Sequence, residues 1–428
     1  KTGLFDFVFR GEAEETLAAL LSLLVEGGSR AGNAVSGALS VPVAGVIAAD
    51  SWKTGNGRIP EPAFVENLDS LSSPFLDGTL NLPSYGGLLW ELSRGCPFGC
   101  HFCYESRGKL GVRVFSLERL ERELEVFAGA GVAQVYVLDP TFNVNGKRAK
   151  NILELIRRKA PSIHFTFEAR SEYLDPELAA LFSSVSCSVQ IGLQSAHPEV
   201  LVHVGRNMDR DDFYEKVLLL HEAEVVYGFD LMYGLPGDSL DGFCESLDFA
   251  LEMRPNHLDI FPLAVLPGTR LAEEASDFGL VWIPGPPYTV LSTPSMNSSD
   301  MNEAQKIAEA CEQLYNKGGA VAWFSMVTEA LSLRPSGLIM EFSAWSGTHR
   351  ASLFESLRSF VQSLFDRAGK KAQGRVAADI ISYFHDTDDP SVLPFYHDPA
   401  ELGAYLESGI DNIEELLLLV PKNPHDTA

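Results

Sequence analysis

Short apolar runs alternate with amphipathic stretches through the middle of the chain. The run from Val132 to Leu138 is apolar and rich in β-branched residues, which is typical of a buried strand. Between such runs, apolar positions recur at helical spacing, which predicts helices that pack one face on a core. The pattern predicts six strands, at 88–93, 132–138, 163–168, 187–193, 225–232 and 257–263.

Helices are expected between these strands, because capping and breaking residues stand where helices should begin and end. Ser116 precedes a charged amphipathic stretch, Asp175 is followed by a proline suited to a first helical turn, and Pro161 ends a helix. The expected helices are 116–129, 146–159, one that opens at 175–176, 211–224, 240–253 and 269–276.

Six strand–helix units in succession imply a parallel sheet, because a helical crossover returns each strand to the same direction. Such a sheet either closes into a partial (β/α)6 barrel or stays open and doubly wound, and the pattern leaves both alternatives open. The fold class is therefore α/β. In both folds, ligands and catalytic groups gather at the carboxyl ends of the strands, so functional residues are expected there.

Polar side chains stand at three of these strand ends. Asp139 and Thr141 follow the second strand, Glu168 and Arg170 end the third, and Gln194 ends the fourth. Turn chemistry explains some of the glycines and prolines at the strand ends. It does not explain a glutamate, an arginine and a glutamine at two successive ends, so these are candidate site residues.

The size and charge of the chain exclude several classes of protein. Its 428 residues suggest two or three domains, and a hydrophobic fraction of 46% excludes a disordered chain. The 33 basic and 58 acidic residues give a net charge of −25, which argues against nucleic acid as a partner. Without an apolar run of about eighteen residues or a signal-peptide pattern, we expect no membrane association and a cytoplasmic protein.

Three of the six cysteines, Cys96, Cys100 and Cys103, fall within eight residues directly after the first strand. Three thiolates on one tight loop can hold three corners of a [4Fe–4S] cluster and leave one iron open. A zinc site is the alternative, with His101 or a distant residue as the fourth ligand. The remaining cysteines are expected to be buried as small apolar side chains: Cys187, Cys244 and Cys311.

The cysteine loop resembles the signature of the radical S-adenosylmethionine (SAM) superfamily, C-x3-C-x-aromatic-C. Cys96, Cys100, Phe102 and Cys103 match it residue for residue. The resemblance implies a partial (β/α)6 barrel, a cluster whose open iron chelates the amino and carboxylate groups of SAM, and Phe102 near the adenine. It also implies an electron donor such as flavodoxin or ferredoxin. Reductive cleavage of SAM would then usually give methionine and a 5′-deoxyadenosyl radical.

The resemblance covers about residues 86 to 270 and assigns roles to the strand-end residues. Asp139 and Thr141 stand where the family meets the amino group of SAM, although the familiar Gly-Gly-Glu form is absent. Arg170 is implied to hold the SAM carboxylate, since a guanidinium binds a carboxylate in a fork. Glu168 is implied to accept from the ribose hydroxyls. A surface ion pair is the alternative for Glu168 and Arg170.

Residues at and after the fourth strand complete the implied cofactor site. Gly192 would let the backbone approach SAM closely, because it carries no side chain. Gln194 is implied to point into the barrel. Arg206 is either at the edge of the cofactor or a helix cap, and the sequence does not separate these two roles.

The N-terminal flank predicts a strand at about 5–9 and a helix that reaches about Val25. With its Arg10-Gly11-Glu12 run, it resembles the end of the cobalamin-binding domain that precedes the barrel in one radical SAM class. Residues 67–71 resemble the usual linker. The Asp-x-His-x-x-Gly motif of one cobalamin-binding type is absent. Three alternatives follow: a truncated cobalamin domain, loss of that domain, or a purely structural cap on the barrel.

Helical patterns replace the strand–helix alternation after about residue 290. They predict helices at 302–332, 350–367, 373–385 and 399–420, and they resemble the helical C-terminal region of some cobalamin-type radical SAM proteins. Such a region is expected to close the barrel over substrate. We therefore expect three parts: an N-terminal segment with its linker at 1–80, the barrel at 81–290 and a mainly helical region at 291–428. Since position 1 is Lys, the chain is expected to be processed, tagged or truncated.

The sequence and the resemblance together predict an enzyme that starts radical chemistry on a small metabolite or peptide. Cobalamin-assisted methyl transfer is one form of it, and aminocarboxypropyl transfer by cleavage of another C–S bond of SAM is an alternative. A non-catalytic, zinc-stabilised α/β binding protein is the alternative from another class.

Overall fold

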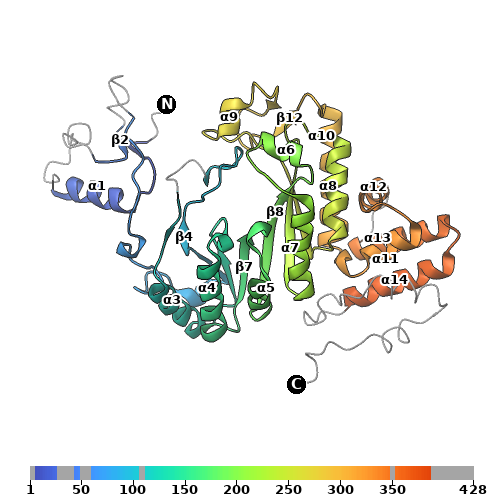
Figure 1. Cartoon of the computed structure of the whole chain (residues 1–428), viewed down its shortest axis with the longest axis horizontal. Helices are drawn as coiled ribbons and strands as arrows, with labels where there is room; N and C mark the ends of the chain where they lie inside the picture. The colour runs from blue at the N-terminus through green and yellow to red at the C-terminus, as the bar shows by residue number, and fades with distance from the viewer. Residues whose placement is uncertain (1–4, 27–42, 49–58, 106–110, 348–351, 387–428) are drawn as a thin grey trace. The chain divides into compact units, whose positions relative to one another are not determined.

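The computed structural model describes residues 5–26, 43–48, 59–105, 111–347 and 352–386 (Figure 1). By their internal contacts these residues form two compact units. The first unit is drawn from Lys1–Gly99, Cys103–Pro140 and Leu155–Ile163, and the second from Cys100–Phe102, Thr141–Glu154 and His164–Ala428.

A six-stranded sheet contains all six predicted strands, in the spatial order β10-β9-β8-β7-β6-β3. Neighbours in the sheet are also neighbours in the chain, whereas a doubly wound sheet reverses its order at a switch point. The order therefore favours the partial barrel and confirms the α/β prediction. The strands are β3 (Gly87–Trp90), β6 (Gln134–Val137), β7 (His164–Ala169), β8 (Cys187–Gln194), β9 (Val226–Tyr233) and β10 (His257–Pro262).

The predicted crossover helices are confirmed, and their caps agree with the sequence. Ser116 accepts a hydrogen bond from Arg119 N at 3.3 Å, and Asp175 accepts one from Leu178 N at 2.8 Å. A short helix that the pattern did not predict, α6 (Pro198–His203), follows β8. The predicted helices are α3 (Leu117–Gly129), α4 (Gly146–Lys159), α5 (Pro176–Ser183), α7 (Arg210–Glu222), α8 (Leu240–Glu252) and α9 (Arg270–Glu274).

An aromatic pair and a buried carboxylate organise the core of the first unit. The rings of Trp90 and Phe127 meet edge to face at 5.6 Å. The Trp90 indole donates to Glu123 at 2.8 Å, and Arg119 Nε donates to the same carboxylate at 3.0 Å. Because a buried carboxylate is costly unless it is hydrogen-bonded, these two donors allow α3 to present Glu123 inward.

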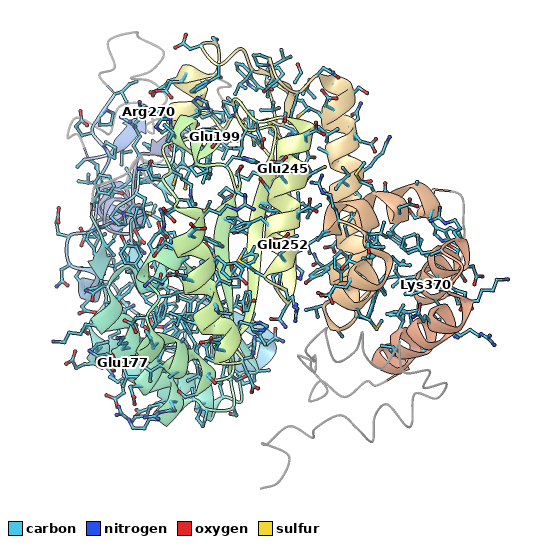
Figure 2. All side chains as sticks on the ribbon, turned by 45° about the vertical axis from the view of Figure 1, so that its right-hand side comes forward. Glu177, Glu199, Glu245, Glu252, Arg270 and Lys370 are labelled. Carbon is cyan, nitrogen blue, oxygen red and sulfur yellow. The ribbon has the colours of Figure 1, made fainter. Side chains whose placement is uncertain are left out.

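In the second unit, the strands bury one face and leave the other more polar. Phe165 and Phe167 on β7 are fully buried, while Glu168 between the buried positions is less so. Helices α5, α7 and α8 run alongside β7 and β8 (Figure 1). On α8, Glu245 and Glu252 are exposed, whereas most of the helix is buried (Figure 2). The apolar face of the sheet therefore packs on helices, and the alternate positions face the interior of the partial barrel.

The first predicted strand is wrong in one respect, because 88–93 divides into β3 and a separate strand, β4 (Ser93–Arg94). β4 pairs antiparallel with β5 (Arg113–Val114), and this two-residue ladder closes the loop that carries the cysteines. The division has a physical cause. The amide of Leu92 donates to the carboxylate of Asp139 at 3.0 Å and its carbonyl accepts from Phe115 N at 3.1 Å.

The N-terminal prediction of a strand and a helix is confirmed by β1 (Phe7–Phe9) and α1 (Glu14–Glu26). A further strand, β2 (Val46–Ala48), pairs antiparallel with β1 and was not predicted. In the predicted linker, Asn67 caps a short 3-10 turn, Leu68–Ser70, that buries Leu68.

The region after the barrel is helical as predicted, but the helix expected at 302–332 is broken. α10 (Ser298–Cys311) begins earlier, at an Asn297 capping box, and a π-helical turn and Gly319 in the left-handed region separate it from α11 (Phe324–Leu331). α12 (Pro335–Ser346) was not predicted, whereas α13 (Leu353–Arg367) and α14 (Lys371–Asp386) were. The helix predicted at 399–420 lies outside the described residues. In the described part of the chain, no helix is both long and apolar enough to cross a membrane.

The aromatic core of the second unit gives a stability prediction. Phe167 is fully buried, with its ring centroid 4.4 Å from that of Phe142 and 5.7 Å from that of Phe182. We expect Phe167→Ala to lower the free energy of unfolding by about 3–5 kcal/mol, measured by urea denaturation, because it leaves a cavity. Phe261→Ala on β10, where the ring is 49% exposed, should change it by less than about 1 kcal/mol. Equal effects of the two substitutions would contradict this packing.

Candidate functional site

The carboxylate of Asp139 lies directly after β6 and is 3% exposed. One oxygen accepts from Leu92 N at 3.0 Å, and the other accepts from the hydroxyl of Ser93. Asp139 therefore fixes the backbone that leads into the cysteine loop. Thr141, the other candidate at this strand end, is buried in the second unit.

The three cysteines of the loop differ in environment from the scattered ones. Cys96, Cys100 and Cys103 are partly exposed. The other three are buried as predicted, and burial raises the pKa of Cys187 to about 12 and that of Cys244 to about 11. Cys187 and Cys244 therefore stay protonated at neutral pH. Since the thiolate is the form that ligates metals, the loop cysteines are the better candidate ligands.

Donor chemistry supports the loop as a cluster site. Three partly exposed thiols within eight residues are the ligand type that iron–sulfur clusters use. Across the described ranges, no three His, Cys, Asp or Glu side chains are already arranged around one point to hold a metal ion. The cluster assignment therefore rests on the kind and spacing of the ligands.

The segment Cys100–Phe102 is tied to two helices of the second unit. His101 N donates to the carbonyl of Val204, just after α6, and the carbonyl of His101 accepts from Leu271 N on α9, each at 2.8 Å. His101 Nδ1 also lies 3.0 Å from the carboxylate of Glu274. Arg270, on the exposed side of α9 (Figure 2), donates to Glu274 at 2.7 Å. That hydrogen bond is the main cause that lowers the pKa of Glu274.

Arg170 is held at the end of β7 by two residues. Asn143 bonds both backbone groups of Arg170, accepting from its N–H at 3.0 Å and donating to its carbonyl at 2.8 Å. The guanidinium donates to Glu172 through Nε at 3.0 Å and through Nη2 at 2.5 Å. Burial, the largest single influence, would raise the pKa of Glu172, but hydrogen bonds and the charges of Arg170 and Arg206 together outweigh it and lower the pKa.

Gly192, Gln194 and Arg206 come together at the end of β8. The register of β8 shifts between Gly192 and Gln194, and Gln194 is in the left-handed region at φ 67°. A Cβ on Gly192 would lie 2.6 Å from Gln194 Nε2 and 3.3 Å from Arg206 Nη1. Arg206 Nη2 donates to the carbonyl of Gly192 at 2.7 Å. The Arg206 side chain therefore reaches the strand end, and backbone groups cap α6.

The guanidinium of Arg206 is in a tightly packed, charged environment. Burial, followed by the neighbouring charge of Arg170, lowers the pKa of Arg206, while Cys100, Glu172 and Asp230 act in the opposite direction. The Nε of Arg206 is buried and has no hydrogen-bond partner. Arg170 and Arg206 thus lie near each other at the ends of the third and fourth strands. Two neighbouring guanidinium groups are suited to bind an anionic group.

A polar network that the sequence analysis missed lies on the inner face of β8, β9 and β10. Gln190 Nε2 donates to Asp230 at 2.8 Å and to Asp259 at 3.3 Å, and His257 Nε2 lies 3.0 Å from Asp259. Gly228 lies beneath Gln190, where a Cβ would come within 2.3 Å of Gln190 Oε1. The sequence carries one signal of this network, because polar residues stand at alternate positions of strands that are otherwise apolar.

Asn143 and Glu172 were also missed as partners of Arg170. Both are close in sequence to candidate residues, but local pattern does not show that their side chains turn toward Arg170. The predicted members Gly192, Gln194 and Arg206 are brought together in the second unit, and Arg170 influences Arg206 there.

Comparison with known proteins identifies the domain that carries these residues. The sequence profile of the radical SAM superfamily matches residues 90–250. The resemblance to the radical SAM superfamily is thus confirmed over these residues. Members of this superfamily use an iron–sulfur cluster and SAM.

Curated relatives of this chain include several methyltransferases. An uncharacterized methyltransferase of Pyrococcus horikoshii is 27% identical over 63% of this chain and 58% of the relative. The cobalamin-dependent radical SAM methyltransferase TokK of Streptomyces tokunonensis is 26% identical over 53% of this chain and 36% of its own length. The chain therefore spans only part of the length of these relatives.

Solved radical SAM structures share the fold. The cobalamin-dependent SAM radical enzyme OxsB with aqua-cobalamin bound has a TM-score of 0.56 at 15% identity, over 94% of this chain and 67% of that chain. The methyltransferase TsrM from Kitasatospora setae, with cobalamin and a [4Fe–4S] cluster bound, has a TM-score of 0.51 at 19% identity, over 65% of this chain and 55% of that chain. At these identities the likeness establishes the fold, which is that of the partial radical SAM barrel.

The inner network of this radical SAM domain gives a pH prediction. Burial, with the charges of Asp259 and Glu168, raises the pKa of Asp230 from 3.8 to about 6, although the hydrogen bond from Gln190 opposes it. A carboxyl with a raised pKa favours the folded state below pH 3.8, and this contribution is lost as the pH rises through 6. Relative to Asp230→Asn, the wild-type chain should lose at most about 3 kcal/mol of unfolding free energy between pH 4 and 7.

The measurement is urea denaturation of the metal-free chain at several pH values. Asn at position 230 can still accept from Gln190, so the comparison isolates the titration. Asp277→Asn, which changes an exposed carboxyl, should follow the wild-type pH curve. If Asp230→Asn also followed that curve, Asp230 would not titrate as described.

Proposed function

We propose that this chain is the radical SAM part of an enzyme that cleaves SAM reductively and begins radical chemistry on a small metabolite or peptide. The observation that carries the proposal is the C-x3-C-x2-C loop within the matched domain, directly after the first strand of a sheet whose strands follow chain order. We propose residues 81–290 as the barrel, between an N-terminal segment at 1–80 and a helical region at 291–428.

Cys96, Cys100 and Cys103 would hold a [4Fe–4S] cluster, which supplies an open iron for SAM and an electron from a donor such as flavodoxin or ferredoxin. The role of the protein is to bind and orient SAM against that site. Phe102 would pack near the adenine, and Glu168 would accept from the ribose hydroxyls. Because an open cluster is sensitive to oxygen, we also propose a cytoplasmic location.

The arginines at the strand ends would hold the carboxylate of SAM. The guanidinium of Arg170 donates two hydrogen bonds to Glu172. The SAM carboxylate would therefore either share this guanidinium with Glu172 or displace Glu172 from it. Gly192 would allow close approach, with Gln194 and Arg206 at its edge. Asp139 would accept from the SAM amino group beside Thr141.

Cobalamin-assisted methyl transfer is the form of this chemistry that the relatives favour. TokK is named as cobalamin-dependent, and the OxsB and TsrM structures contain cobalamin. The Arg10-Gly11-Glu12 run adds support, since it resembles the end of a cobalamin-binding domain. Aminocarboxypropyl transfer is the alternative outcome, which would release methylthioadenosine in place of 5′-deoxyadenosine.

The first test concerns the loop cysteines. Changing Cys96, Cys100 or Cys103 to Ala should abolish the brown charge-transfer absorbance and the iron of the anaerobically reconstituted protein, because each thiolate is a ligand. Wild-type protein with SAM and a strong reductant should form 5′-deoxyadenosine, detected by mass spectrometry. Cys244→Ala is the matched control, since this thiol is buried and protonated, and it should retain both iron and product.

Full iron loading in all three loop variants would refute the cluster assignment. A colourless wild-type protein that binds zinc would favour the structural binding protein instead. Methylthioadenosine from a brown protein would support aminocarboxypropyl transfer.

The second test concerns Arg170. Arg170→Ala should weaken SAM binding about 10-fold to 100-fold, because charge-assisted hydrogen bonds to a carboxylate are lost, while the iron content stays unchanged. Isothermal titration of the reconstituted protein with SAM measures the affinity. Arg210→Ala is the control, since this arginine packs 4.3 Å above the ring of Phe249 on another part of the unit. Unchanged SAM affinity in Arg170→Ala would remove Arg170 from the site.

A further inference from the structure

Two arginines are paired across the stem of the cysteine loop. β4 and β5 form a ladder of only two residue pairs, Ser93 with Val114 and Arg94 with Arg113. The chain between them, from Gly95 to Val112, contains the three cysteines. Like charges opposite each other on paired strands are destabilising, so this short stem needs a compensating group.

Arg94 already donates to Glu91 through Nε at 2.8 Å and Nη2 at 3.0 Å, and it lies 2.7 Å from Glu14. The carboxylate that contacts both arginines is that of Glu12, which belongs to the same unit but lies far away in sequence. Its carboxylate accepts from both terminal nitrogens of Arg113, in one case at 2.8 Å. Arg94 Nη1 lies 3.4 Å from Glu12 Oε2. A single carboxylate therefore contacts both arginines of the stem, and a forked guanidinium–carboxylate contact of this kind is strong and directional.

Further contacts fix this carboxylate in place. The Val65 amide donates to Glu12 Oε2 at 2.8 Å, and the side chain of Glu12 is 17% exposed. Burial, the largest single influence, would raise the pKa of Glu12, but hydrogen bonds from Arg113 and Val65 together with the charges of Arg113 and Arg94 outweigh it and lower the pKa. Glu12 is thus charged at neutral pH and largely removed from water, where its attraction for the arginines is stronger than on the surface.

The backbone before Glu12 explains why a glycine precedes it. Gly11 is in the left-handed region at φ 84°, and a Cβ there would lie 2.1 Å from the carbonyl oxygen of Ala63. Arg10 and Glu12 bond the two backbone groups of Ala63 at 2.9 and 2.8 Å. Only glycine fits this close approach, so the Gly11-Glu12 pair aims the carboxylate at the stem.

Glu14 offers a natural comparison. It lies 2.7 Å from Arg94 and is 42% exposed. It therefore has the same charge and one of the same partners as Glu12, but it has no recorded contact with Arg113 among the described residues. A general electrostatic effect of the N-terminal segment would involve both glutamates, whereas bridging of the stem involves Glu12.

We propose that Glu12 is a positioning residue for the iron–sulfur cluster, because it holds Arg94 and Arg113 together at the stem of the loop that carries the ligands. The inference rests on the proposed function, since it requires a cluster in that loop. It gives the N-terminal segment a role in cluster stability that is separate from any cobalamin binding.

The test uses the full chain, reconstituted anaerobically with iron and sulfide. The rate at which the cluster absorbance is lost to an iron chelator should rise at least about fivefold in Glu12→Gln, because Arg113 then loses its forked carboxylate partner opposite Arg94. In Glu14→Gln, the rate should stay within about twofold of wild type, because this carboxylate is more exposed than that of Glu12 and Arg94 keeps Glu91 as a partner. The Glu12→Gln,Arg113→Gln double variant should return most of the way to the wild-type rate, since one of the opposed charges is gone.

A second measurement needs no cluster. In the metal-free chain, hydrogen exchange of the Phe115 amide, which donates to the carbonyl of Leu92 at 3.1 Å, should be faster in Glu12→Gln than in Glu14→Gln. It reports whether the stem itself has loosened. Circular dichroism melting that is unchanged in Glu12→Gln would exclude general unfolding as the cause.

The outcomes separate this inference from the proposed function. Wild-type protein that takes up no cluster would overturn both. Cluster uptake in the wild type, with the same loss rate and the same Phe115 exchange in Glu12→Gln, would overturn the positioning role alone. If the cluster were lost faster in Glu12→Gln and the added Arg113→Gln change did not slow this loss, the positioning role would also be overturned. Glu12 would then act through Val65 and not through the paired arginines.

Discussion

The hydrogen bonds of the buried Asp139 carboxylate determine where the cysteine loop begins. By accepting from Leu92 N and the Ser93 hydroxyl, Asp139 takes the first strand out of the parallel sheet after Trp90. The freed chain then pairs with β5 and forms the stem of the loop. Since a buried carboxylate without donors would cost several kcal/mol, the turn and the carboxylate stabilise each other. The position of the loop thus depends on a side chain that the loop does not contain.

In the second unit, buried apolar side chains and polar side chains alternate along the strands, so the packed core and the polar candidate site lie on opposite faces of the sheet. β7 and β8 bury Phe165, Phe167 and Val189 toward the helices, and the intervening positions carry Glu168 and Gln190. Since successive residues of a strand point to opposite faces, the apolar core and the polar interior need no separate elements. Gly192 and Gly228 complete this arrangement, because any side chain at either position would collide with the polar groups beside it.

The sequence was most informative where a pattern is local. Apolar periodicity predicted all six strands of the sheet, and Ser116 and Asp175 marked helix starts through hydrogen bonds within a few residues. Two-residue strands such as β4 and β5 are too short to carry a pattern, so they were missed. The break before α11 comes at a π-helical turn and at Gly319 in the left-handed region, and a glycine within a helical pattern does not by itself predict a break.

The same distinction explains the site. Gly192 and Gln194 stood out because they end an apolar strand and are close in sequence. Asn143 holds Arg170 from another strand end, 27 positions away, and Glu12 holds Arg113 over 101 positions. A polar residue in a sequence does not reveal which distant donor it faces, so these partners needed the structure.

Two carboxylates, one at each end of β4, are held by hydrogen bonds and ion pairs, and together they constrain the geometry of the cysteine loop. Asp139 fixes the entry through Leu92 and Ser93, and Glu12 joins Arg94 to the returning strand at Arg113. Losing Asp139 would remove the acceptor of Leu92 N and the Ser93 hydroxyl, and losing Glu12 would remove the forked carboxylate partner of Arg113. Either loss in a poorly solvated place costs more than a surface pair contributes. The ladder itself is only two residue pairs long, so backbone pairing alone cannot maintain it. The geometry of the loop is therefore specified by side chains from the second strand of the sheet and from the N-terminal segment.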